Sequence, residues 1–510
     1  MAEVILPKIF SDNAVLQRDQ PIKIFGKTVA NTMVSVKLGD STETTKSITN
    51  GEFVVMMPAQ TTNFDVTLEI FVNGELSKII KHLQIGEVWL NAGQSNMNLA
   101  LRYDHDYQVN AKNILSEIGD ASISYFEVPK IVTDEDKQNT KLKGGGCWQR
   151  LSFQNAEQFS AASYYFALKL SQKIPDVPIG IIWMAFDGTT ASSWTSQKYL
   201  SQNPVLKSVF LDSYEDVLLH LSRKDYDKYL EATRIRNQRQ EVGDFWDKVL
   251  KGEIPHQQLQ EAFKNNHSFF GDYVMGPSSE NRPHALYDNM VSTIAGYTIR
   301  GVNYYQGESD DTNAGIYDIL LANLINNWRD EWQMKIPFTV MQLAPFKHWF
   351  GSFDGRMFPT LRHKQQQVAN ALTDVYLTNV MDHGEEWDIH PKEKRIVGER
   401  FALVAFDRIY RLIKHGEAPS IDRVMLNSNE ISITFNNANQ LHANADIEIE
   451  VLRNGVVADY EARLQDNMLI IGIDNDENDN LMINYLQNDY IVATIFNENG
   501  IPVSPFSINL

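Results

Sequence analysis

The 510-residue chain has few cysteines and no surplus of positive charge. Its one cysteine, Cys147, has no second thiol to pair with, which excludes an intrachain disulfide. The formal net charge is −19, and this argues against nucleic acid or an anionic membrane as a partner, because binding phosphates requires a basic surplus. We therefore expect a neutral ligand, or an anion bound by a few local cations. The oligomeric state stays open.

Long apolar runs are also missing. No segment approaches the roughly 20 apolar residues that a membrane-spanning helix needs. The first residues, MAEVILPKIFSDNAVLQRD, lack the basic and then apolar pattern of a secretory signal peptide. We expect a periplasmic or secreted protein whose signal peptide is not part of this sequence, with a cytoplasmic location as the alternative.

Hydrophobic periodicity divides the chain into three predicted domains. Residues 1–85 show period-two runs of Val, Ile and Phe with Asn-Gly turns, which predict an all-β domain. Residues 86–412 alternate short apolar runs with amphipathic segments. A charged and mostly helical insertion lies at about 200–280 within this second domain. Residues 413–510 return to β character and predict a second all-β domain.

The middle domain has the pattern of an α/β sandwich. Apolar strands with helices between them predict a parallel sheet that is covered on both faces. The predicted strands are 87–92, 178–186, 298–306, 337–344 and 375–381, and the predicted helices are 161–174, 315–332 and 392–413.

Small polar motifs follow four of the predicted strands. Ser95 follows the first strand, Asp187-Gly188 the second and Gln306 the third, while His390 comes shortly after the last. Because sites in open α/β sheets lie at the carboxyl ends of strands, we expect these residues to meet although they are far apart in the sequence.

This set of residue types suits nucleophilic catalysis. Ser95 needs a base to become a nucleophile, and His390 can serve, with Asp388 as the group that orients it. A developing oxyanion needs donors, and the N–H groups of Ser95 and Gly188 with the side-chain amide of Gln306 can supply three.

Each of these elements also has a simpler interpretation. A serine at a strand-to-helix turn is often an N-cap. The Asp-x-His spacing also fits a metal pair, but no third ligand of recognised spacing accompanies it. The Gly-x-Ser-x-Gly motif of the common α/β-hydrolases is absent, since Met97 holds its last position. Joint placement at four strand ends favours the catalytic interpretation.

At these residues the chain resembles the SGNH hydrolase superfamily, and within it the sialate O-acetylesterase-like carbohydrate esterases. The resemblance spans nearly the whole chain. Its motifs, in order, are LPKIFSDNAVLQRDQPIKIFG (6–26), GQSNM (93–97), PIGIIWMAFDGTTASSW (178–194), GVNYYQGESD (301–310), DIHPKEK (388–394) and FNENGIPVSPF (496–506).

The resemblance implies a three-layer, flavodoxin-like α/β/α sandwich that removes O-acetyl groups from sugars through an acetyl-enzyme on Ser95, with no metal and no cofactor. It implies His390 as the base, Asp388 as its partner, and Ser95, Gly188 and Gln306 as the oxyanion hole. The expected substrate-contacting residues are Gln94, Asn96, Glu308, Trp194 and Arg282, of which Arg282 is a cation for an anionic sugar.

Two departures from the family pattern stand out. Asp187 occupies a position where glycine is usual, and its charge opposes an anionic sugar. The Asp-x-His spacing is shorter than in the wider superfamily, which leaves a backbone carbonyl as an alternative partner of His390. The alternative functions are an acetylesterase for xylan or another plant polysaccharide, and a glycan-binding protein without catalysis. A lipase or thioesterase of the same superfamily is a further alternative.

Overall fold

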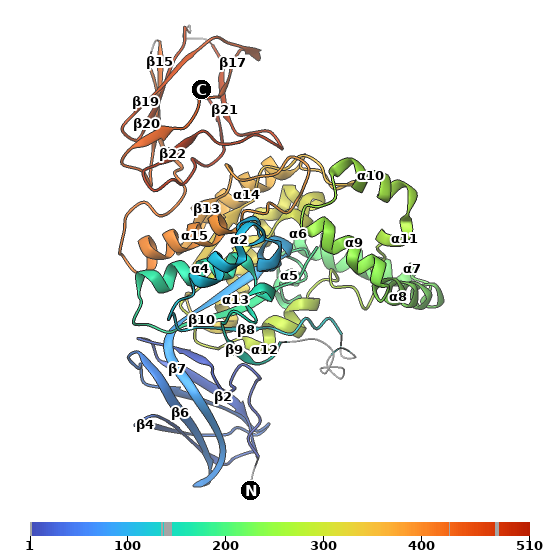
Figure 1. Ribbon diagram of the computed structural model, residues 1–510, viewed down its shortest axis with the longest axis vertical. Coiled ribbons are helices and arrows are strands. Elements are labelled where there is room, and N and C mark those ends of the chain that lie inside the picture. The colour runs from blue at the N-terminus through green and yellow to red at the C-terminus, as the bar shows by residue number, and fades with distance from the viewer. Residues whose placement is uncertain (1–2, 134–135, 137–144, 428, 475–478) are drawn as a thin grey trace.

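The computed structural model describes residues 3–133, 136, 145–427, 429–474 and 479–510. β-rich regions lie at the two ends of the elongated molecule, with an α/β region between them (Figure 1). The segment that follows β10 (Ile179–Ala185) is helical and contains α5 (Gln197–Gln202), α6 (Pro204–Leu206), α7 (Ser213–His220), α8 (Arg223–Asn237), α9 (Gln240–Leu250), α10 (His256–Asn265) and α11 (His267–Phe270). Of these, α7 to α11 project from one side of the middle region (Figure 1).

The middle region is built on a sheet of order β13-β12-β11-β7-β10-β8-β9, in which only β9 runs antiparallel to its neighbour. Every residue of β10, β11 and β12 is buried, as expected of strands covered on both faces. The strands are β7 (Glu75–Gly93), β8 (Ile123–Glu127), β9 (Trp148–Arg150), β10 (Ile179–Ala185), β11 (Gly301–Tyr305), β12 (Phe338–Gln342) and β13 (Val375–Asn379).

Helices cover this sheet in two packed pairs. α4 (Ala161–Lys173) packs on α15 (Lys394–Val404), and α13 (Tyr317–Trp332) packs on α14 (Phe358–Ala371). The predicted three-layer α/β/α sandwich is confirmed. The sequence did not predict the short strands β8 and β9, nor α14. Shorter helices are α1 (Ser95–Asn98), α2 (His105–Ser116) and α12 (Ser292–Ile294).

The helix predicted for 392–413 is too long. α15 ends at Val404, a π-helical turn covers Ala405–Ile409, and Arg411 takes a left-handed conformation with φ 57°. A residue in this conformation ends a helix, because the next N–H can no longer reach the carbonyl four residues back.

The N-terminal β region shares a strand with the central sheet. β7 pairs with β6 over its first part and with β10 and β11 over its last part. Where it passes from one to the other, buried Glu87 forms ion pairs of 2.7 Å with both Arg18 and Arg300. The other strands here are β1 (Val15–Gln17), β2 (Ile22–Lys27), β3 (Met33–Leu38), β4 (Ser41–Lys46), β5 (Glu52–Met57) and β6 (Asn63–Val72).

The C-terminal β region has an apolar core of its own between two four-stranded sheets. One sheet has the order β14-β15-β20-β19 and the other β18-β17-β21-β23, with β16 and β22 paired beside them. The strands are β14 (Ile421–Asn427), β15 (Glu430–Phe435), β16 (Leu441–Ala443), β17 (Glu450–Arg453), β18 (Val456–Val457), β19 (Glu461–Gln465), β20 (Met468–Gly472), β21 (Leu481–Tyr485), β22 (Ile495–Asn497) and β23 (Phe506–Asn509).

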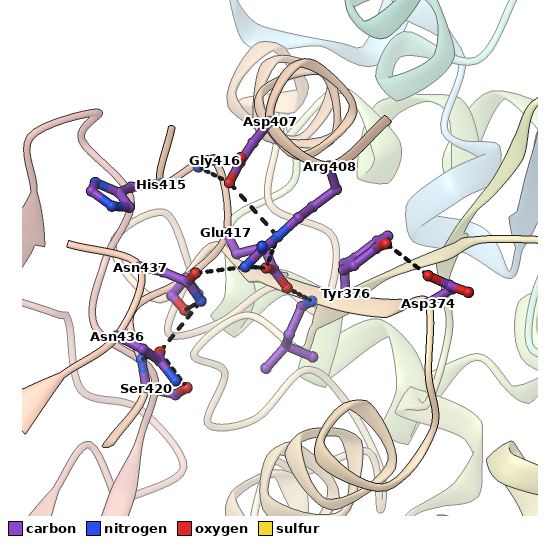
Figure 2. Close-up of polar contacts among 12 residues, drawn as sticks. Asp374, Tyr376, Asp407, Arg408, His415, Gly416, Glu417, Ser420, Asn436 and Asn437 are labelled. Carbon is purple, nitrogen blue, oxygen red and sulfur yellow. Dashed lines mark hydrogen bonds and ion pairs between the residues drawn. The ribbon is translucent and has the colours of Figure 1, made fainter. Parts of the chain in front are cut away.

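Charged side chains tie this C-terminal region to the π-helical turn that follows α15 (Figure 2). Arg408 donates to Glu417 and, at 2.8 Å, to Asn437 Oδ1. Asp407 accepts the Gly416 N–H at 2.9 Å. We propose the domain boundaries expected from the sequence, 1–85, 86–412 and 413–510; β7 continues through the first of them.

Candidate active site

Three neighbouring strands end at the same level. Ala185 of β10 and Tyr305 of β11 both pair with Gly93, the last residue of β7. A Cβ on Gly93 would lie 1.9 Å from the Tyr305 carbonyl oxygen, so only glycine fits there. The loops that follow these strands therefore start side by side. In the sheet, β7 has β10 on one side and β11 on the other, and sites in open α/β sheets lie at such a point.

Ser95 is the first residue of α1, the short helix that begins directly after β7. The first N–H groups of a helix have no partner within it, and they point toward whatever lies at its start. In the described part of the chain, no acceptor takes the N–H of Ser95. Ser95 therefore offers a hydroxyl and a free backbone donor at one point.

Gly188 lies in the loop after β10 in a left-handed conformation, with φ 68°. Its carbonyl accepts from Asn281 Nδ2 at 2.8 Å, while its own N–H meets no acceptor among the described residues. A Cβ added to Gly188 would meet no atom within 4 Å, because the residue borders open space. Gly188 thus presents a second free backbone donor.

A cavity of about 880 Å³ joins these groups. Ser95, Gly188 and His390 line it together, as do Gln94 and Glu308, which the sequence predicted as substrate-contacting. Residues from four chain segments that are far apart in the sequence thus meet at one edge of the sheet.

His390 is buried and lies next to a carboxylate. Its Nδ1 is 3.4 Å from Asp388 Oδ1, and that same oxygen accepts the His390 backbone N–H at 2.8 Å. Asp388 Oδ2 accepts from Lys392 Nζ at 2.8 Å. Nδ1 of His390 has no hydrogen-bond partner among the described residues, and the Asp388 carboxylate at 3.4 Å is the group that the sequence suggested as its partner.

The two groups titrate in ways that suit a base and its partner. Burial raises the Asp388 pKa, but the close contact with His390 and the charge of Lys392 outweigh burial and lower the pKa to about 2. Burial lowers the His390 pKa below its ordinary value of 6.5, against the opposing effect of Asp388. Near neutral pH, His390 is therefore an uncharged imidazole beside a carboxylate, which is the state a general base requires.

The helical insertion reaches this site through an aromatic cluster. Trp349 stands edge-on to the His390 ring with the centroids 4.9 Å apart. On its other side Trp349 packs against Trp246 of α9 at 6.0 Å. Leu250, at the end of α9, and Tyr273 line the cavity. The insertion thus forms part of the cavity wall and supports the base.

Gln306 is fully buried and does not line the cavity. Its side-chain amide donates to Thr189 O at 3.0 Å, Gln94 Oε1 at 3.2 Å and Asp310 Oδ2 at 2.6 Å. In this structure the amide hydrogens are therefore directed at protein acceptors, and they hold the loop of Gly188 to the loop after β11.

Asn96 lies beneath the cavity in a buried polar chain. Its amide donates to Glu308 Oε1 at 2.5 Å, and its oxygen accepts from Lys394 Nζ at 2.6 Å. Burial raises the pKa of Glu308 and lowers that of Lys394 to about 7. Asn96 therefore positions other polar groups and does not border the open space.

Two further residues predicted to contact substrate lie elsewhere. Trp194 is 1% exposed and donates its indole N–H to Thr189 Oγ1 at 3.0 Å, which makes it a support for the loop of Gly188. Arg282 does not line the cavity, and its Nη2 donates to Val132 O at 3.0 Å. The structure thus does not bring either residue to Ser95.

Sequence reasoning missed several cavity residues. Glu127, at the end of the unpredicted strand β8, and Asp311, in the turn after β11, both line the cavity. Neither belongs to a pattern of local spacing, so only the position of β8 beside β10 could have drawn attention to Glu127.

Two searches of the described residues complete this account. Within the ranges given above, no three His, Cys, Asp or Glu side chains are grouped so that they could hold a metal ion. Among the helices described, none is both long enough and apolar enough to cross a membrane.

A three-layer sandwich with a serine after its central strand and a histidine in its last loop, flanked by β domains, has the architecture of the SGNH hydrolases. A sequence profile described as "Carbohydrate esterase, sialic acid-specific acetylesterase" matches residues 275–406. A crystal structure of a carbohydrate acetylesterase from Xanthomonas citri has the same fold, with a TM-score of 0.73, 24% identity and coverage of 99% of each chain.

The resemblance indicated by the motifs is confirmed by curated relatives. Sialate O-acetylesterase of Rattus norvegicus is 24% identical over 455 residues, which are 80% of this chain and 73% of the rat protein. The Homo sapiens protein is 23% identical over 80% of this chain and 70% of its own length. The match to the Mus musculus protein covers 65% of this chain but 57% of the mouse protein, less than two thirds of its length.

Proposed function

We propose that this chain is a serine esterase that removes O-acetyl groups from carbohydrates. The observation that carries the proposal is the cavity lined by Ser95, Gly188 and His390, in which Ser95 and Gly188 each keep a backbone N–H that meets no acceptor among the described residues. Asp388 beside Nδ1 of His390 supplies the group that orients the base. The profile match and the curated relatives support the same activity.

The proposed reaction has two halves. His390 takes the Ser95 proton as Oγ attacks the acetyl carbonyl carbon, and the resulting oxyanion accepts from the two backbone N–H groups. The sugar oxygen then leaves with the proton from His390, and the acetyl group stays on Ser95. Water attacks this acetyl-enzyme while His390 takes its proton, and acetate leaves as Ser95 regains its hydrogen.

Gln306 is the third oxyanion donor in the scheme expected from the sequence. Its amide hydrogens are directed at protein acceptors, so it reaches the oxyanion only if it gives up one of them. We propose that the two backbone groups form the hole and that Gln306 holds their loops in place. We further propose an acetylated glycan as the substrate and a periplasmic or secreted location.

The test is acetate release by wild type, Ser95→Ala and Ser309→Ala. Ser309 lines the same cavity, so its replacement is a matched control for loss of a cavity hydroxyl. We expect Ser95→Ala to lose at least about a thousandfold in kcat, as nucleophile removal does. We expect Ser309→Ala to stay within about tenfold of wild type, since it takes no part in the chemistry. A folded wild type that releases no acetate from any acetylated sugar contradicts the proposal and favours glycan binding without catalysis.

A further inference from the structure

The cavity beside Ser95 carries an excess of acidic groups. Four carboxyl side chains line it, and they come from the ends of three strands: Glu127 is the last residue of β8, Asp187 follows β10, and Glu308 and Asp311 follow β11. One permanently charged cation, Arg102, lines the same space.

Arg102 is already bound to protein groups. Its guanidinium donates to Gln158 Oε1 and, at 3.0 Å, to the Tyr103 hydroxyl, and it lies 4.7 Å from the centre of the Tyr103 ring. The Tyr103 hydroxyl in turn donates to Asp247 Oδ1 at 3.1 Å. The guanidinium of Arg102 is therefore bound by neutral protein groups, with the Asp247 carboxylate one hydrogen bond further on.

The other cations near the site do not line the cavity, and one of them, Lys130, lies 5.7 Å from the centre of the Phe186 ring. Lys392 binds Asp388 and Lys394 binds Asn96, and neither lines the cavity. Arg282, which the sequence suggested for an anionic sugar, lies outside the lining as well. Burial raises the pKa of Glu127, Glu308 and Asp311, and the charges of Lys130 near Glu127 and Lys394 near Glu308 offset this effect only in part.

Four buried polar atoms of cavity-lining residues have no hydrogen-bond partner among the described residues: Asn98 Oδ1, His390 Nδ1, Glu308 Oε2 and Trp183 Nε1. The last two, an acceptor and a donor, belong to side chains that are 6% exposed. A hydroxyl group both donates and accepts, so the hydroxyls of a sugar can satisfy both atoms. A carboxylate only accepts, and it cannot satisfy Glu308. Trp183 and Trp349 also offer aromatic surface on which the apolar face of a sugar ring can rest.

On the basis of the proposed esterase function, we propose that this site takes uncharged O-acetylated sugars and that its four carboxyl groups select against sugars that bear a carboxylate. Charge-assisted hydrogen bonds from sugar hydroxyls to these carboxyl groups favour the neutral ligand. Repulsion in a confined space disfavours the anion, so the same residues supply both sides of the discrimination.

The test compares two substrates that differ in one charge. These are 9-O-acetyl-N-acetylneuraminic acid and its methyl ester, with acetate as the measured product, so that cleavage of the methyl ester is not counted. At low salt we expect kcat/KM for the methyl ester to exceed that for the acid by at least about tenfold, from like charges acting across a partly hydrated cavity. In about 0.5 M NaCl the ratio falls, because salt screens exposed charges.

The variant Asp187→Asn locates the effect. Asp187 is exposed beside Gly188 and is held by Asn98 Nδ2 at 2.8 Å. We expect Asp187→Asn to reduce the ratio by about threefold or more. Asp176→Asn makes the same change in net charge at the amino end of β10, away from the cavity, and should leave the ratio unchanged.

The outcomes separate this inference from the proposed function. Ser95-dependent acetate release from both substrates at equal kcat/KM, or faster from the acid, overturns the inference and leaves the esterase intact. No Ser95-dependent acetate release from either substrate or from 4-nitrophenyl acetate overturns the esterase proposal itself. A ratio that Asp176→Asn lowers as much as Asp187→Asn contradicts the role of the cavity carboxyl groups.

Discussion

Replacing Asp388 and Lys392 one at a time should move the acid limb of the pH–rate profile in opposite directions. Asp388 and Lys392 both face His390, as does Lys394, and their charges act on its pKa with different signs. Asp388 favours the protonated imidazole, and the two lysines disfavour it. Since the proposed mechanism needs neutral His390, the rate falls as pH drops through the pKa of this histidine.

The expected sizes follow from the contacts. Burial places the wild-type limb below pH 6.5. Asp388 Oδ1 lies 3.4 Å from His390 Nδ1. An opposite charge at such range typically shifts a pKa by about 1–3 units, so Asp388→Asn should move the limb down by about one unit or more. Lys392 lies on the far side of Asp388, and Lys392→Met should move the limb up by roughly half a unit.

Asp388→Asn should also lower the plateau of kcat/KM by between about a hundredfold and ten-thousandfold, because the imidazole loses the group that orients it. The assay is kcat/KM for acetate release between about pH 3.5 and 8, which reports the free enzyme. Lys37→Met is the control, since Lys37 pairs with Glu69 at 3.1 Å in the N-terminal β region. It should leave the limb in place. Shifts of the same sign in the Asp388 and Lys392 variants, or no shift in either, would refute His390 as the base.

Three further predictions concern single residues. Gly188→Ala and Gly455→Ala both place a methyl group in open space at positive φ, so each should lower the free energy of unfolding by about 1 kcal/mol in chemical denaturation. Only Gly188→Ala should lose activity. Equal activities of the two variants contradict the role of Gly188. Lys394→Met leaves Asn96 Oδ1 unpaired and should lower the free energy of unfolding by about 1–3 kcal/mol in the same assay. An unchanged free energy of unfolding contradicts the importance of this contact. The pKa of Asp388 is lowered from 3.8 to about 2, so this carboxylate should add roughly 2 kcal/mol to the free energy of unfolding above pH 4. This stability is lost as the pH falls toward 2. Asp388→Asn should remove this pH dependence in urea unfolding.

The sequence predicted the main elements of the central domain because they bury apolar side chains in regular patterns. The run 178–186 became β10 and the segment 161–174 became α4, each within one residue or two of its predicted ends. β9 has three residues, too few for any period to show, and it exists because β8 offers it an edge. The helical backbone that runs from α15 through the π-helical turn ends at Ile409, short of the predicted residue 413, because Arg411 takes a left-handed conformation that no spacing pattern predicts.

In the candidate site as well, local patterns predicted some features and tertiary contacts decided the others. Ser95, Gly188 and His390 were predicted because each follows a strand, and parallel strands end at one edge. Gln306 follows a strand equally closely, yet its amide turns to Thr189, Gln94 and Asp310. Trp194 stands in a family-like motif, yet it is buried against Thr189. Position after a strand fixes where a backbone lies, but the surrounding contacts fix where a side chain points.

The sequence by itself determined the order of the strands and helices, the level at which the polar motifs meet, and the residue types available for nucleophile and base. These follow from local periodicity, which extends over about ten residues, and from the rule that parallel strands end at one edge of a sheet. The tertiary structure alone decided that Glu127, Asp311 and the end of α9 border the same space as Ser95. It also decided that Arg282 does not. The charge of a cavity is a sum over residues brought together by packing, and no segment of the chain contains that sum.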